Sequence, residues 1–456
     1  MNPLELQWTP SSGYPTATSM VSTLLSINPT AVPALTESMV HAAESLATAT
    51  LRNDLILLSR VIRGAKASLT AISAQQVIAT ATESAQQAEA TLALLQASYN
   101  LQRLALEENF YKYYMNLGAN VFFFVVFALL LFFNVGMLYK SRHHWYNISF
   151  ICGYILEFLG FLGRILSTTN YTNMNYYLLQ YAPLTISPAF FMAGIYFIFA
   201  QNVIMYGKQY TILPPIWYSY FFIASDAICL IVQGVGGGMA SEASKTSTDP
   251  APGTWTMFAG VLAQTVAMSV FVIFWFNFLW RLYFHHTNPN STNKLAKKGL
   301  LNYFRLLLHL PSTRAYKAEE LEPFYDPEYH HIRQRKLVPY FPLAITIAVA
   351  AIYIRCIYRV VELKEGFDGY LITHEVFIMV LDAALIFIAG AVFVPFHPVF
   401  VFGPKNIFNV ARVRGKHNAD QENKRGDESL DTLMDEVPPS NVDLTYDRIP
   451  AAKERA

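Results

Sequence analysis

The sequence predicts an all-α, polytopic membrane protein with seven transmembrane helices and an extra helical region before the first of them. Hydrophobic residues make up 53% of the 456 residues and charged residues only 14%, a composition typical of membrane proteins. Seven apolar stretches are each long enough to cross a hydrocarbon core of about 30 Å, which needs about 20 helical residues. Basic residues gather in alternate loops, as they do on the cytoplasmic side of membrane proteins.

The chain before the first span divides into two parts. Residues 1–33 are rich in Ser, Thr and Pro and have no clear period, which predicts a disordered lead. Residues 34–112 are rich in Ala, Leu, Gln and Glu, and Gly64 is the evident breaker, so we expect two helices outside the membrane. Two interpretations of this region stay open: a helical hairpin through which the chain forms a homo-oligomer, and a loosely ordered spacer.

The transmembrane domain is assigned to residues 113–403. Its predicted spans are Leu117–Leu138, Trp145–Leu166, Pro183–Met205, Ile216–Met239, Thr254–Leu279, Pro339–Val360 and Leu371–Val394. Pro183 and Pro188 are expected either to kink the third span or to begin it. The glycines at 234 and 236–238 predict that the fourth span ends in a glycine-capped terminus or in a segment that unwinds or allows close helix approach.

Loop charges predict the orientation. Lys140 and Arg142 follow the first span, Lys208 follows the third, and the loop 280–338 after the fifth is long and basic. The alternate loops are uncharged, nearly balanced or acidic. Since Lys and Arg are retained on the cytoplasmic side, we expect the N-terminus outside and the C-terminus inside. The tail, residues 404–456, mixes charge with Pro and Ser and is expected to be cytoplasmic and disordered.

One segment of the basic loop, residues 294–310, has an amphipathic pattern. Helical spacing places four apolar residues on one face and most of the basic residues elsewhere, as in a helix that lies in the membrane interface. The apolar residues are Leu300, Phe304, Leu307 and Leu308, and the basic residues are Lys297, Lys298 and Arg305. Anionic inner-leaflet lipid is the expected contact.

Charged and polar residues inside the apolar spans are candidate site residues, because charges within a bilayer are expensive and usually functional. They come from five helices, and helical rise places them in the central and predicted outer layers. The candidate substrate-binding residues are Glu157, Arg164, Asp226, Gln233, Gln264, Arg355, Arg359, Glu362, Glu375 and Asp382. Since each buried charge must be paired or wetted, the pattern predicts an internal polar cavity open toward the outer face.

Two interpretations of these residues stay open. In the first, Glu157, Asp226 and Asp382 offer negative charge to a cationic headgroup, while the arginines organise those carboxylates or bind phosphate. In the second, all of them form structural ion pairs that hold the bundle together.

Several classes of chemistry lack a signature in the sequence. No phosphate-binding Gly-rich loop is present, and the paired histidines fall in predicted loops, so no cofactor and no metal are expected. The three cysteines, Cys152, Cys229 and Cys356, fall in apolar segments and are expected to pack as small hydrophobic residues. A net charge of +1 argues against nucleic acid as a partner.

Several short motifs follow one another along the spans in a defined order. Glu157-Phe-Leu-Gly-Phe-Leu-Gly-Arg164 lies in the second span and Pro188-Ala189 in the third. The order continues with Asp226, Gln233 and the glycine run, then Gly260 to Gln264, Arg355-x3-Arg359-x2-Glu362, Glu375, Asp382 and His397-Pro398. Over about residues 113–398 this order resembles the fungal lipid-translocating exporter family of seven-span proteins.

The resemblance adds Tyr196 to the candidate substrate-binding residues, because a tyrosine follows the family's third-span motif. It implies export or transbilayer movement of amphipathic lipids, such as sphingoid bases, and of lipophilic toxicants. It also implies a role in drug or stress resistance and a location at the plasma membrane or at internal membranes. Departures such as Phe161 in place of the usual tyrosine leave the substrate open.

The first functional interpretation is therefore a non-enzymatic transporter whose partners are membrane lipids and an amphipathic lipid substrate. The alternative is a seven-helix receptor or sensor for lipid or stress signals, which the span count and orientation also permit. An intramembrane lipid hydrolase is disfavoured, because neither a convergent histidine set nor a serine nucleophile with a clear base is present.

Overall fold

The computed structural model describes residue 14 and residues 26–50, 52–212, 214–246, 248–285, 294–366 and 369–404. Within these ranges the chain is helical and contains no β-strand, which confirms the predicted all-α fold class. Most of the predicted disordered lead, residues 1–33, lies outside the described residues, but residues 29–33 are helical, so the prediction is wrong there. The predicted tail lies outside the described residues except for residue 404.

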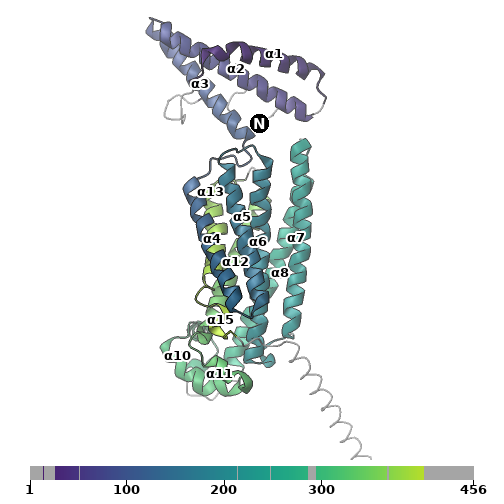
Figure 1. Cartoon of the computed structure of the whole chain (residues 1–456), viewed down its shortest axis with the longest axis vertical. Helices are drawn as coiled ribbons and strands as arrows, with labels where there is room; N and C mark the ends of the chain where they lie inside the picture. Colours follow the sequence, from purple (N-terminus) through teal and green to yellow (C-terminus); the bar gives the residue numbers. More distant parts are fainter. Residues whose placement is uncertain are drawn as a thin grey trace, which may run out of the picture. The chain divides into compact units, whose positions relative to one another are not determined.

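The region before the first span contains three helices rather than the predicted two. They are α1 (Val32–Thr48), α2 (Arg52–Thr80) and α3 (Ser84–Glu108), seen in Figure 1. Gly64 lies inside α2, so the prediction that it breaks the helix is wrong. A glycine costs a helix only about 1 kcal/mol relative to alanine, and here a Cβ would lie 3.1 Å from Leu104 of α3. Close packing between α2 and α3 explains the glycine.

Six of the described helices are long and apolar enough to span a membrane. They are α4 (Leu117–Lys140), α5 (His144–Ser167), α6 (Met174–Tyr206), α7 (Pro215–Thr246), α8 (Ala251–Phe284) and α12 (Phe341–Glu365). The seventh predicted span is helical from Glu375 to Ala391 but is interrupted: α13 (Glu375–Ile378) and α14 (Ala384–Ala391) flank a π-helical segment, Met379–Ala383. The chain is an integral membrane protein.

The bundle presents large apolar side chains outward, as a lipid-facing surface does. Phe132 on α4 is 72% exposed and Ile231 on α7 is 68% exposed. The charged residues that lie away from the helix ends are instead buried: Glu157, Arg164, Asp226, Arg355, Arg359, Glu362 and Asp382. Each long helix from α4 to α8 packs against the next one in the sequence, α6 against α7 included, and α12 packs against both α8 and α14. We call the end that carries the N-terminus of α4 the predicted outer end, since the orientation stays a prediction.

The glycine run lies inside α7 and neither unwinds nor caps the helix. Both α7 and α8 continue past it, and a Cβ on Gly236 would lie 2.5 Å from the backbone nitrogen of Met257 on α8. Of the interpretations offered by the sequence, close helix approach is the one that the structure supports. Likewise Pro183 and Pro188 lie within α6, which begins earlier than predicted, at Met174.

The basic loop folds at the opposite end of the bundle. It contains α9 (Leu300–Leu307), α10 (Pro311–Tyr316), a π-helical segment (Lys317–Leu321) and α11 (His330–Arg333), and α15 (Pro398–Val401) follows the seventh span. The 3₁₀ turns of the chain are Pro29–Ala31, Lys208–Tyr210, Lys294–Ala296, Glu322–Phe324, Pro327–Tyr329 and Val338–Tyr340. The helix predicted over 294–310 is therefore shorter than expected. Arg333 fixes the loop to α6 by donating to the Met205 carbonyl at 2.7 Å.

Candidate functional site

The buried charges form separate groups, the largest of which centres on Asp382. Arg355 and Arg359 lie four residues apart on α12, so their side chains project from one face of the helix. The Arg355 Nε and the Arg359 Nη2 both donate to the carboxylate of Asp382, which lies in the π-helical segment. Arg359 also donates to the Glu362 Oε2 at 2.9 Å. Two guanidinium groups and two carboxylates thus neutralise one another by direct contact.

The same group supports an irregular turn in α6. Pro188 has no backbone N–H, so the carbonyl of Leu184, four residues earlier, lacks its helical partner. Arg355 supplies the missing donor, because its Nη2 lies 2.6 Å from the Leu184 oxygen. A buried carbonyl left unpaired would destabilise the fold. Arg355 therefore joins α12 to both α6 and the seventh span.

A second group lies at the predicted outer end and joins α4, α5 and α13. The Arg164 Nη2 donates to the Glu375 Oε1 at 2.7 Å, and the Arg164 Nε donates to the Asn120 side-chain oxygen. Glu375 also accepts from the Asn116 backbone N–H at 2.6 Å and from the Asn120 Nδ2 at 2.8 Å. These contacts fix the first turn of α4 to the start of the seventh span.

Two buried acids, Glu157 on α5 and Asp226 on α7, form no direct ion pair, although Glu157 lies beside Arg164 and Asp382. They are 2% and 5% exposed, yet neither carboxyl forms a salt bridge with any residue that the structure describes. Asp226 accepts from the Tyr196 hydroxyl at 3.0 Å, and the Ser187 hydroxyl lies beside Glu157. Because a buried charge needs a counter-charge, these are the acids that a cationic ligand would neutralise.

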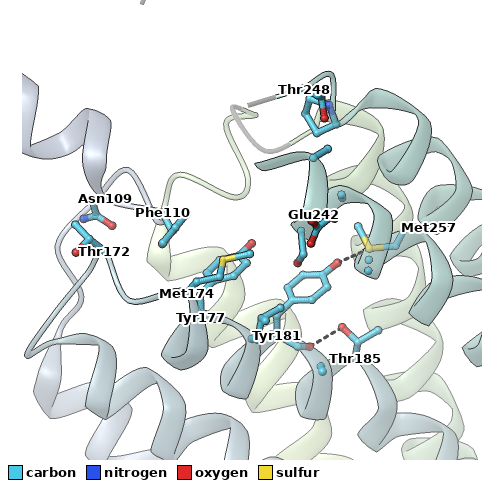
Figure 2. A pocket seen from close by; sticks show the side chains of 18 of the residues that line it. Asn109, Phe110, Thr172, Met174, Tyr177, Tyr181, Thr185, Glu242, Thr248 and Met257 are labelled. Carbon is cyan, nitrogen blue, oxygen red and sulfur yellow. Dashed lines mark hydrogen bonds between the residues drawn. The ribbon is translucent and has the colours of Figure 1, made fainter. Parts of the chain in front are cut away.

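A cavity of about 1360 Å³ opens at the predicted outer end. The first half of α6 and the second half of α7 form two of its walls, and residues of α2 and of the end of α3, such as Leu57 and Glu107, also line it. Figure 2 shows Tyr177, Tyr181 and Thr185 of α6 facing it. The Tyr181 hydroxyl donates to the Met257 sulfur of α8 at 3.1 Å and closes one side. Small-molecule pockets typically measure roughly 300–1,000 Å³, so this cavity can hold a polar headgroup together with part of an apolar chain.

The cavity and the buried charges occupy different places. Of the eleven predicted site residues, all of them described, Gln233 is the one that lines the cavity, and its Nε2 donates to the Gln264 Oε1 at 2.9 Å. The void beside Glu157, Arg164 and Asp382 does not admit a water-sized sphere. The expected single polar chamber that holds every charge is therefore not what the structure contains. Opposite charges on neighbouring helices pair directly, which removes the need for water.

Helix α7 connects the cavity to one of the buried acids, because it carries both Gln233 and Asp226. Asp226 lies seven residues before Gln233, hence on the same helical face and about 10 Å deeper. Tyr196, its partner, lies further along α6 than the cavity residue Thr185. The α6 and α7 walls of the cavity thus converge on the Tyr196–Asp226 pair.

Sequence reasoning missed several residues that shape the site. Tyr177, Tyr181 and Thr185 recur every four residues on α6, a spacing that places them on one face and that could have been noticed. Asn120 is an amide inside a strongly apolar span, which was a second available signal. Within the described residues no cluster of His, Cys, Asp and Glu is placed to hold a metal ion.

Comparison with known proteins places these features in a family context. A family model described as RTA1 like protein matches residues 150–405, a range that contains all eleven predicted site residues. The sphingoid long-chain base transporter RSB1 of Saccharomyces cerevisiae strain JAY291 is 38% identical over 295 residues, which are 64% of this chain and 74% of that protein.

Two further yeast relatives are more distant. Protein RTA1 of Saccharomyces cerevisiae strain ATCC 204508 / S288c is 25% identical over 325 residues, covering 66% of this chain and 86% of that protein. Protein RTM1 of Saccharomyces cerevisiae is 27% identical over 248 residues, covering 54% of this chain and 65% of that protein. No solved structure matches the chain.

Proposed function

This chain belongs to the RTA1-like protein family, and from that membership we infer that it moves amphipathic lipids across a membrane without chemical conversion. The observation that carries the proposal is the 38% identity to a protein named as a sphingoid long-chain base transporter, over 74% of that protein's length. The family match covers α6 and α7, which line the cavity, and all residues of the group around Asp382. The plasma membrane is the location that we propose.

A route for an amphipathic cargo must be polar on one side and apolar on the other, because the headgroup needs polar partners while the tail stays in hydrocarbon. The cavity between α6 and α7 supports such a route. Thr185 and Gln233 line it, whereas Ile231 and Val235 of α7 are 68% and 55% exposed on the lipid-facing surface. The tail would follow that surface while the head occupies the cavity.

We assign the deeper headgroup contacts to Asp226 and Tyr196, with Glu157 as a second acid. Neither Asp226 nor Glu157 forms a direct salt bridge with a described residue, so a cationic headgroup could neutralise them as it passes. The ion-paired residues Arg355, Arg359, Glu362, Asp382, Arg164 and Glu375 would instead keep the helices in place around the route. Gln233 would bind the headgroup at the cavity wall, and Gln264, which accepts from it, would position its side chain.

Flux measurements in vesicles test this proposal. Purified protein is reconstituted, and the movement of a fluorescent sphingoid base between leaflets is followed. Wild-type protein should accelerate movement over protein-free vesicles, whereas Asp226→Asn and Glu157→Gln should lose most of that acceleration while inserting normally. Glu319→Gln, at an exposed loop position, is the control and should retain it.

Two outcomes would reject parts of the proposal. Full flux in both acid variants would remove Asp226 and Glu157 from the mechanism. Binding of the sphingoid base without movement between leaflets would favour the receptor alternative, which the relatives do not otherwise favour.

A further inference from the structure

The short helix α9 has two apolar faces instead of one. Tyr303, Leu306 and Leu307 are buried against the protein, so Leu307 does not lie on the outward face where the sequence pattern placed it. Four other large apolar side chains point outward, with exposed fractions of 71%, 66%, 53% and 47%: Leu300, Leu301, Phe304 and Leu308. At 3.6 residues per turn they occupy an arc of about 100°. An apolar arc of this size needs a partner that covers it.

The position of α9 indicates what that partner is. The Tyr303 ring stacks against Trp280 with a centroid distance of 6.0 Å and contacts Phe276 at 6.4 Å. Both residues lie in the last turns of the span α8, and they are 36% and 38% exposed on its outer surface. The outward face of α9 is therefore continuous with a surface that already faces lipid, at the depth where aromatic residues mark the membrane interface.

The charge around α9 has a single sign. No acidic residue occurs between Asp249 and Glu319. Lys297, Lys298 and Arg305 are all exposed, and in the described part of the chain none of the three forms a salt bridge. Basic residues held at the surface of an anionic membrane contribute about 1 kcal/mol each to binding. Phosphate groups would supply the counter-charges that the protein does not.

We propose that α9 lies in the interfacial plane of the leaflet at this end of the bundle and binds anionic phospholipids. Leu300, Leu301, Phe304 and Leu308 insert among the acyl chains, and Lys297, Lys298 and Arg305 bind the headgroup phosphates. This surface lies at the opposite end of the bundle from the α6–α7 cavity, so its lipids are ligands rather than cargo.

Insertion of the apolar face can be measured with a spin label. The full chain, with Cys152, Cys229 and Cys356 replaced by alanine, carries a single label at Leu301→Cys or, as a water-exposed control, at Ala43→Cys on α1. The protein is placed in nanodiscs of phosphatidylcholine with phosphatidylserine. The label at 301 should be reached by oxygen in preference to a water-soluble nickel chelate, and the label at 43 should show the reverse. Equal nickel access at both positions would overturn the proposal and leave a protein partner as the occupant.

The charge contribution has its own test. Phosphatidylserine should raise the melting temperature of the wild-type chain above its value in phosphatidylcholine alone. The combined variant Lys297→Gln, Lys298→Gln, Arg305→Gln should lose most of that rise, whereas Lys66→Gln on α2 should keep it. An equal rise in all three proteins, or none in the wild type, would contradict phosphate binding at α9.

Discussion

At the residue scale, the buried acids of this protein divide into two classes by their partners. Asp382 accepts from Arg355 and Arg359, and Glu375 accepts from Arg164. Asp226 instead accepts a hydrogen bond from the Tyr196 hydroxyl. Removing one member of a buried ion pair leaves the other member as an uncompensated buried charge. Removing an acid that has no ion-pair partner leaves no such charge behind. The two classes should therefore respond differently to neutralisation.

Asp382→Asn should destabilise the protein by about 3–5 kcal/mol, because two buried guanidinium groups would lose their shared acceptor. Asp226→Asn should leave the stability close to that of the wild type. Thermal unfolding of both variants in the same detergent measures the difference. Equal melting temperatures for the two variants would contradict the division into structural and transport acids.

Lys317, in the loop outside the spans, is a half-buried charge. Its amine lies 5.1 Å from the centroid of the Tyr283 ring, and burial lowers the pKa of Lys317 to about 7. An unfolded lysine has a pKa of about 10.4. Between these values the unfolded chain binds more protons than the folded one, so this residue makes stability rise with pH.

Lys317→Met keeps the apolar stem and removes the charge, so the variant should be more stable than the wild type at about pH 6, where the folded lysine is protonated. The advantage should shrink as the pH rises toward about 10. Melting temperatures of both proteins across this range provide the measurement. An advantage that stays constant with pH would show that the amine is not held at a lowered pKa.

At the element scale, the irregular parts of the helices are the places where buried polar groups attach. Pro188 frees the Leu184 carbonyl for Arg355, and the π-helical segment of the seventh span carries Asp382. Arg355 thus forms hydrogen bonds at two sites where a helix departs from regular α-helical geometry. Regular helices on either side would offer neither the free carbonyl nor this placement of the carboxylate, since all their backbone groups would be paired internally.

The contact between α7 and α8 provides a prediction at this scale. Gly236→Ala should lower the melting temperature, because its Cβ would lie 2.5 Å from the Met257 backbone nitrogen. Gly234→Ala, two residues away, meets open space and should stabilise the helix by up to about 1 kcal/mol. Opposite shifts in melting temperature are expected. A similar shift in both variants would mean that α7 and α8 do not approach closely at Gly236.

The elements were predictable where hydropathy determines them. Six spans follow from long apolar runs, since membrane insertion depends on those runs themselves. The start of α6 was missed, because Met174 to Ala182 is rich in tyrosine and polar residues and carries a weak hydropathy signal. Gly64 was mistaken for a break, because its role depends on Leu104 of another helix. Contacts of that kind leave no local trace in the sequence.

At the scale of the whole molecule, the identity of the polar residues was more predictable than their arrangement. The spacing of Arg355 and Arg359 indicated a shared face, and the structure places both on Asp382. Which residues pair across helices depends on packing, so the division into separate groups could not be derived from spacing. A polar cavity open toward the outer face was predicted, but its position between α6 and α7 was not, because the residues that line it there are mostly uncharged.

In the mechanism that we propose, ion pairs set the positions of the helices, and lipid enters where α6 and α7 part. Arg355 holds α6, α12 and the seventh span together, and Arg164 joins α4, α5 and α13. The cavity lies outside these fixed contacts, and its walls converge on Tyr196 and Asp226. The central claim of the proposal is that cargo enters between α6 and α7.

Filling the cavity tests this claim most directly. A side chain added at Gly234 of α7 meets open space in the cavity wall, and one added at Gly136 of α4 meets open space away from the cavity. Flux of a fluorescent sphingoid base is measured in vesicles containing Gly234→Phe or Gly136→Phe at matched amounts of inserted protein. We expect Gly234→Phe to lose most of the wild-type flux and Gly136→Phe to retain the wild-type flux. Undiminished flux through Gly234→Phe would contradict the claim that lipid passes between α6 and α7.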